Sequence, residues 1–140
     1  MKAIDIEINN LTKNRIDRKF FKKIAQRALK LLKIKLPEIS LVFTSDSRMK
    51  SLNRKYRGKN RVTDVLAFDY GLPFGGQGEI IICLPQAKRQ AKKFNHPLKK
   101  ELAILLIHGI LHLAGYSDET TRGYNKMANK QKELWQKIIQ

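Results

Sequence analysis

Apolar and polar residues alternate at the start of the chain and recur with helical spacing in much of the rest. Ile4, Ile6 and Ile8 occupy alternate positions, which predicts a half-buried strand. After Asp17, apolar residues recur with the period of an amphipathic helix whose outer face is basic. Together with local turn signals, these patterns predict strands at residues 3–8, 39–44, 63–70 and 79–83, and helices at about residues 18–33, 46–56, 85–94, 97–113 and 119–139.

Local signals mark where several of these helices begin and end. Ser45 or Asp46 is placed to cap the second helix, and Gly58 opens the loop that follows it. Pro97 suits the first turn of the fourth helix. Strands and helices are interspersed, and two helices close the chain. We therefore expect a single α+β domain over residues 1–140, with a small mixed four-stranded sheet packed with about five helices.

The fourth helix carries the most informative pattern in the chain. Residues 102–113 are apolar nearly all round, so the helix is expected to be buried in the centre of the domain. Within it, His108 and His112 are four residues apart, which turns their side chains by only about 40° on a helix. Both imidazoles are therefore predicted to reach one metal ion. Asp118 follows the helix-ending Gly115 and is the predicted third ligand.

Other interpretations of these residues are open at this stage. The histidines are alternatively structural, and Ser117 or Asp118 alternatively caps the last helix. Zinc proteases carry a glutamate directly after the first histidine, whereas Gly109 stands there in this chain. A peptidase would therefore lack its general base. A glycine inside a helix also indicates that something approaches the backbone closely at that point.

Composition and charge add a partner class to this picture. The chain has 140 residues with 42% hydrophobic content, enough for one core, and a net charge of +17. This charge favours a polyanionic partner, with RNA, DNA and anionic lipid all open. Cys83 is the only cysteine, which excludes an internal disulfide and a cysteine-rich zinc site. No signal-type or membrane-spanning apolar run is present, so we expect a cytoplasmic protein without a membrane partner.

The basic residues are concentrated in two acid-free stretches, residues 47–62 and 84–100. They either form an ordinary solvated surface or, as we predict, bind the phosphate backbone of a nucleic acid. Tyr70 and Phe74 are weak candidates for base stacking, Phe94 is assigned to the core, and His96 to the surface. The predicted nucleic-acid-binding residues are Arg54, Lys55, Arg57, Lys59, Arg61, Lys88 and Lys92.

The histidine segment is also recognisable as a family motif. Residues 108–116, His-Gly-Ile-Leu-His-Leu-Ala-Gly-Tyr, closely resemble the signature His-Gly-x-Leu-His-Leu-x-Gly-Tyr-Asp-His of the YbeY family of bacterial endoribonucleases. Segments 52–60, 63–68 and 78–83 resemble further blocks of that family in the same order. One position departs from the signature, because Asp118 stands where the family has its third metal-binding histidine.

The resemblance implies a metal-dependent, single-strand-specific endoribonuclease that acts in small-subunit 3′-end ribosomal RNA maturation and in ribosome quality control. It implies one divalent ion, expected to be zinc, held by His108, His112 and Asp118. Arg57 matches the family arginine near the metal, so Arg57, His108 and His112 are the expected catalytic residues. The expected partners are single-stranded RNA, ribosomal RNA and the small subunit. The alternatives are a zincin-like metal hydrolase or protease, and a non-catalytic ribosome-assembly factor with a structural metal.

Overall fold

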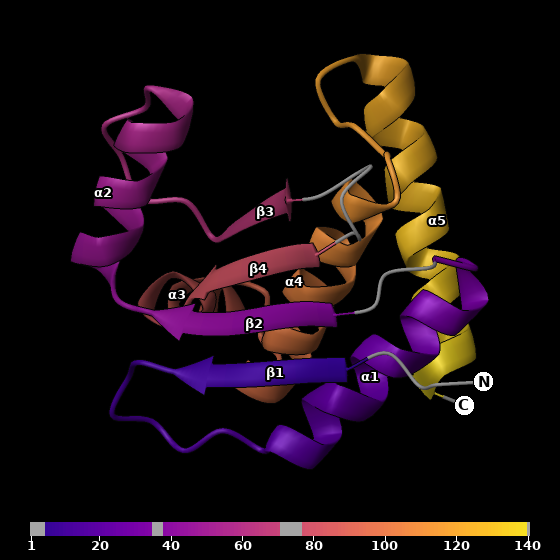
Figure 1. The fold of residues 1–140 in the computed structure, drawn as a ribbon, viewed down its shortest axis with the longest axis horizontal. Helices are drawn as coiled ribbons and strands as arrows, with labels where there is room; N and C mark the ends of the chain where they lie inside the picture. The colour runs from indigo at the N-terminus through magenta and orange to yellow at the C-terminus, as the bar shows by residue number, and fades with distance from the viewer. Residues whose placement is uncertain (1–4, 35–37, 71–76, 140) are drawn as a thin grey trace.

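A mixed four-stranded sheet forms the centre of the computed structural model, which describes residues 5–34, 38–70 and 77–139 (Figure 1). The strand order is β1-β2-β4-β3, in which β1, β2 and β4 run parallel and β3 is antiparallel to β4. The predicted α+β fold with a mixed sheet is confirmed. The strands are β1 (Asp5–Asn10), β2 (Glu38–Thr44), β3 (Val65–Tyr70) and β4 (Gln77–Cys83).

Five helices pack around this sheet in the described part of the chain, as expected. Figure 1 shows α4 behind the sheet, with α1, α3 and α5 around it, and α2 standing apart beside the ends of the strands. Among the described residues, no helix is long and apolar enough to cross a membrane. The helices are α1 (Arg18–Leu31), α2 (Asp46–Arg57), α3 (Leu84–Lys93), α4 (Leu98–Leu113) and α5 (Thr121–Ile139).

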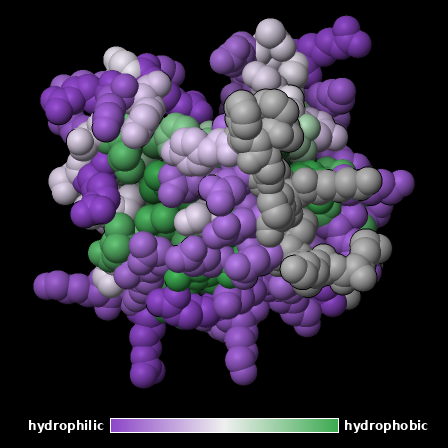
Figure 2. All heavy atoms as spheres, viewed as in Figure 1, coloured by the Kyte–Doolittle hydropathy of each residue, from purple (hydrophilic) through white to green (hydrophobic). Residues whose placement is uncertain are grey.

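Alternation along the strands divides the core between the two faces of the sheet. Ile80 and Ile82 of β4 belong to the main core with α1, α3, α4 and α5, whereas Ile81 and Cys83 belong to a smaller cluster with Met49 of α2. The residues of this second cluster are buried, but the hydrophobic side chains packed against it are only partly buried, and Figure 2 shows hydrophobic side chains at the surface beside α2 among hydrophilic neighbours. The helix α2 is thus held on its own face of the sheet.

The predicted caps of α2 are present, and the boundaries of each element differ from expectation by only one or two residues. Ser45 accepts a hydrogen bond from the backbone N–H of Arg48, and Gly58 ends α2 with a φ of 68°. The strand expected from residue 63 begins at Val65, because the side chain of Asp64 accepts from the Val65 N–H at 2.8 Å. Part of the expected first strand, residues 3–4, lies outside the described residues.

The end of α3 corrects two expectations. Phe94 was expected in the core but is 57% exposed, because α3 ends at Lys93 before its apolar face reaches that position. Asn95 then turns the chain with a φ of 53°, and this turn folds His96 back. His96 was expected on the surface, but its side chain is only 15% exposed, and its Nε2 lies 2.7 Å from Oε1 of Glu101. Glu101, in the first turn of α4, is only 3% exposed.

The central helix α4 is buried along most of its length, as its sequence predicts. Its glycine explains how closely it approaches the sheet. A Cβ atom on Gly109 would lie 2.8 Å from Cγ2 of Ile80 on β4. The expected close approach at Gly109 is therefore confirmed, and the approaching group is a core isoleucine of the sheet.

Candidate metal centre

His108, His112 and Asp118 bring three potential ligand atoms to one point at the end of α4. The Nε2 atoms of the two histidines are 3.2 Å apart. Oδ2 of Asp118 lies 3.8 Å from Nε2 of His108 and 3.9 Å from Nε2 of His112. Tetrahedral zinc with bonds of about 2.0–2.1 Å separates its ligand atoms by roughly 3.3 Å. The three donors, one from each residue, all lie within 4.8 Å of one another and therefore fit a divalent ion.

A tight turn after α4 returns the chain toward the histidines. Gly115 adopts a φ of 98°, and its N–H donates to the oxygen of His112 at 3.0 Å. The next helix is capped by Thr120, whose Oγ1 accepts from the N–H of Gly123 at 3.0 Å. Thr120 therefore occupies the capping position considered above for Asp118, and the carboxylate of Asp118 faces the two imidazoles.

Hydrogen bonds at the outer nitrogens define the tautomers of both histidines. His112 Nδ1 lies 3.1 Å from the carbonyl oxygen of Tyr116, which only accepts, so Nδ1 carries the proton. Gln131 donates from Nε2 to the oxygen of Ile104 at 2.9 Å, which directs its Oε1 to His108 Nδ1 at 3.1 Å. Both Nε2 atoms then present lone pairs to each other. A cation placed between them relieves this repulsion, as in metal sites with outer hydrogen-bond partners.

The local electrostatics favour the metal-binding form of His112. Burial lowers the pKa of His112, and the nearby His108 lowers it further because two protonated imidazoles would repel each other, while Asp118 opposes the shift. The charge of Arg57, the last residue of α2, also contributes to lowering this pKa. A histidine that stays neutral offers its lone pair to a metal at lower pH than an unperturbed one.

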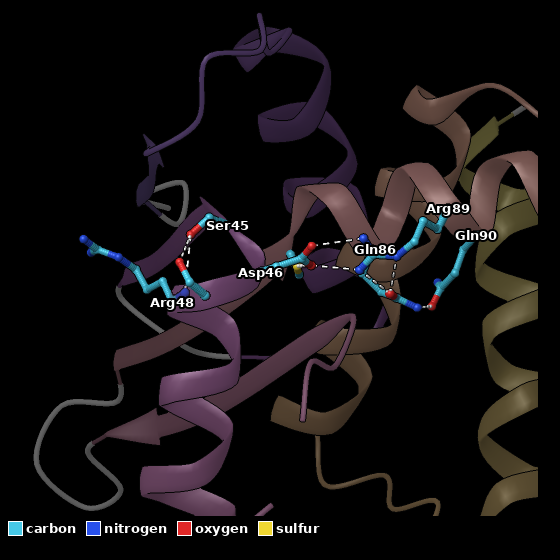
Figure 3. A network of polar contacts seen from close by, with 8 residues as sticks. Ser45, Asp46, Arg48, Gln86, Arg89 and Gln90 are labelled. Carbon is cyan, nitrogen blue, oxygen red and sulfur yellow. Dashed lines mark hydrogen bonds and ion pairs between the residues drawn. The ribbon is translucent and has the colours of Figure 1, made fainter. Parts of the chain in front are cut away.

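The predicted nucleic-acid-binding residues lie on two linked helices and the loop after α2. Asp46 of α2 forms a bidentate ion pair with Arg89 of α3, with N···O distances of 2.8 and 3.0 Å (Figure 3). The pair links the first turn of α2 to α3 across the end of the sheet. All seven predicted residues are exposed, namely Arg54, Lys55, Arg57, Lys59, Arg61, Lys88 and Lys92.

Two polar groups around the centre were missed at the sequence level. Gln131 comes from α5, 23 residues after His108, and no local pattern distinguishes it from the other polar residues of that helix. Glu101 offered a weak signal, because a carboxylate beside a strongly apolar segment requires a buried partner such as His96. Phe74, a weak stacking candidate, lies outside the described residues, and Tyr70 is exposed at the end of β3.

Comparison with known proteins places this centre in a family. The family model described as endoribonuclease YbeY matches residues 6–139. The endoribonuclease YbeY of Persephonella marina is 40% identical over 129 residues, covering 88% of this chain and 84% of that protein. The Aquifex aeolicus protein of the same name is 38% identical over 112 residues, covering 78% of this chain and 75% of the relative.

The fold supports the same assignment. The solution structure of TM1509 from Thermotoga maritima matches with a TM-score of 0.60 and 29% identity, covering 94% of this chain and 90% of that one. The motif resemblance noted in the sequence is thus confirmed over nearly the whole chain, and the protein belongs to the endoribonuclease YbeY family.

Proposed function

We propose that this protein is a metal-dependent endoribonuclease that cleaves single-stranded RNA, with ribosomal RNA as its substrate. The observation that carries the proposal is the pair of Nε2 lone pairs, 3.2 Å apart, that face each other beside the carboxylate of Asp118. The net charge of +17 supports an RNA ligand, and the relatives are named endoribonucleases. Within the cell we propose a cytoplasmic role in small-subunit 3′-end maturation and ribosome quality control, with residues 1–140 acting as one unit.

In this proposal, His108, His112 and Asp118 hold one divalent ion, for which zinc suits two nitrogen donors and one oxygen donor. Such an ion supplies an acidified water as nucleophile, or a positive charge that polarises the phosphate while the 2′-hydroxyl of the RNA attacks. Gln131 and the Tyr116 carbonyl hold the imidazoles in the tautomer that directs Nε2 to the ion.

Arg57 is the proposed phosphate-binding residue of the reaction. Its charge acts on His112, and its guanidinium is exposed at the end of α2. A guanidinium binds two phosphate oxygens at once and stabilises the negative charge that develops during attack on phosphorus. The exposed basic residues of α2, its following loop and α3 extend this positive surface and bind the flanking backbone in the proposal.

A zinc peptidase is disfavoured by the environment of Gly109. The position that holds the general base in zinc proteases faces Ile80 in the core, so a side chain there would meet the sheet. The remaining alternative is an assembly factor in which the metal only stabilises the fold.

Cleavage of a single-stranded ribosomal RNA fragment tests the proposal. We expect metal-loaded protein to cleave, chelator to abolish cleavage, and Arg57→Ala to reduce kcat by roughly 100-fold. Arg15→Ala is the matched control, because Arg15 is an exposed arginine in the loop between β1 and α1. Equal cleavage in all samples would reveal a contaminating nuclease. Absence of cleavage with every divalent metal tried would favour the assembly factor, and a 2′,3′-cyclic phosphate on the product would identify attack by the 2′-hydroxyl.

A further inference from the structure

A pocket of about 540 Å³ opens directly beside the metal centre. His108 forms part of its wall, so the pocket and the metal centre share a boundary. The rest of the wall comes mainly from α3, the turn after it and α4. Its volume is within the range of about 300–1,000 Å³ that is typical of sites for small organic ligands. We call this cavity the α3 pocket.

The α3 pocket has an exposed aromatic ring in its wall. Phe94 lines it and is 57% exposed, although burial would stabilise such a side chain. The His96 ring lies 6.0 Å from the Phe94 ring, centre to centre, and the Lys93 ammonium lies 5.8 Å from the same ring. Aromatic rings next to cations are the stacking surfaces on which single-stranded nucleic acids place their bases.

Besides stacking, recognition of a base needs hydrogen bonds in the plane of its ring. A series of hydrogen-bonded side chains centred on α3 can provide them. Asp46 holds Arg89, and Arg89 donates to Oε1 of Gln86 at 2.6 and 2.9 Å (Figure 3). Gln86 donates to Gln90 at 3.2 Å, and Gln90 donates to the buried Glu101 at 2.8 Å. Each donating amide has two N–H groups and uses one in this series, which leaves one for a ligand.

The charged groups of the α3 pocket are mostly engaged within the protein, which suits a neutral ring carried on an anionic backbone. The wall contains the carboxylates of Asp64 and Glu101, but Glu101 is engaged by His96 and Gln90. Asp64 accepts from the backbone of Val65. Lys93 has no carboxylate partner among the described residues, and the protein carries a net charge of +17.

We propose that the α3 pocket binds one nucleobase of the RNA strand, stacked on Phe94 and hydrogen-bonded by Gln86 and Gln90. The neighbouring phosphate then reaches the metal centre, because His108 belongs to both sites. This inference rests on the proposed endoribonuclease function and adds to it a base-binding subsite. It gives single-strand preference a physical cause, since a paired base is not free to enter a pocket.

A short single-stranded RNA with 2-aminopurine at successive positions tests this inference. Binding is measured by fluorescence quenching in the presence of chelator, so that no cleavage occurs. We expect Phe94→Ala to weaken binding by about 5- to 100-fold and to remove the quenching at one position, while Phe94→Trp retains both. Leu31→Ala is the matched control, because Leu31 is also exposed, at 43%, but lies at the end of α1. Since Phe94 is exposed, thermal melting should verify that its variants fold.

An abasic scan of a cleavable RNA completes the test. An abasic residue at the quenched position should lower wild-type affinity but not the affinity of Phe94→Ala, because that variant already lacks the stacking contact. The inference is overturned when Phe94→Ala binds as tightly as the wild type, or when abasic substitution has no effect at any position. If either result is found while the wild type still cleaves RNA in a metal-dependent way, only the base-binding inference fails and the endoribonuclease proposal stands. Failure of the wild type to cleave any RNA contradicts that proposal instead, whatever the binding data show.

Discussion

The Nδ1 atom of His108 lies 3.1 Å from Oε1 of Gln131, and the amide nitrogen of Gln131 donates to the Ile104 carbonyl oxygen. This geometry fixes the His108 tautomer through a residue on a different helix. We predict that Gln131→Leu weakens zinc binding by about 10- to 100-fold, because the acceptor that holds Nδ1–H is lost. Competition with a chromogenic chelator measures the change.

Two variants separate this effect from a change in packing. Gln131→Glu retains an acceptor for Nδ1–H and should bind zinc better than Gln131→Leu. Gln136→Leu makes the same substitution at an exposed position of α5 and should leave zinc affinity unchanged. Equal affinities for Gln131→Leu and Gln136→Leu would show that the hydrogen bond to His108 has no influence on the metal.

The third ligand can be tested by exchange of the side chain. Asp118→Asn should reduce zinc affinity more than Gln131→Leu does, because it removes the negative charge of the proposed third ligand. Asp118→His should restore binding, since imidazole is a suitable zinc ligand. Equilibrium dialysis with elemental analysis provides the measurement. Glu119→Gln removes a neighbouring exposed carboxylate and serves as control. An Asp118→Asn variant with wild-type affinity would exclude Asp118 from the ligand set.

The sequence predicted those parts of the centre that depend on local geometry. His108 and His112 share one helix, and Gly115 turns the chain so that Asp118 follows closely, so spacing alone was informative. Gln131 was not predictable, because the contact between α4 and α5 depends on how the helices pack. The assignment of Phe94 to the core was wrong because periodicity does not show at which residue a helix ends.

The contact between α4 and the sheet leads to a stability prediction. In Gly109→Ala the new Cβ would lie 2.8 Å from Cγ2 of Ile80, a stiff β-branched side chain in the core. Overpacking costs about 1–3 kcal/mol, while the higher helix propensity of alanine returns about 1 kcal/mol. We therefore expect the free energy of unfolding to fall by up to about 2 kcal/mol, as measured with urea.

A double-mutant cycle identifies the cause of that loss. Ile80→Ala removes the clashing methyl group and creates space, so Gly109→Ala should be neutral or stabilising in the Ile80→Ala background. The same destabilisation in both backgrounds would mean that Ile80 is not the group that requires glycine at this position.

The buried thiol of Cys83 should react very slowly with alkylating reagents in the folded protein. Burial raises its pKa to about 12, and the thiol donates to Oδ1 of Asp46 at 3.2 Å. A group with this pKa is ionised to roughly one part in ten thousand at pH 8, compared with about a quarter for an ordinary cysteine. We expect alkylation by iodoacetamide to be slower than in guanidinium-unfolded protein by at least about 1,000-fold, because only the thiolate reacts.

Replacement of Asp46 distinguishes the two causes of this pKa shift. Burial is the larger cause, so Asp46→Asn should leave native alkylation slow although the nearby negative charge is lost. Raising the pH from 8 to 10 should accelerate native labelling, since the thiolate fraction grows about tenfold for each pH unit below the pKa. Labelling of the native wild type at the rate of the unfolded chain would contradict the packed position of Cys83. Fast labelling confined to Asp46→Asn would instead assign the protection to the carboxylate and to its contact between α2 and the end of β4.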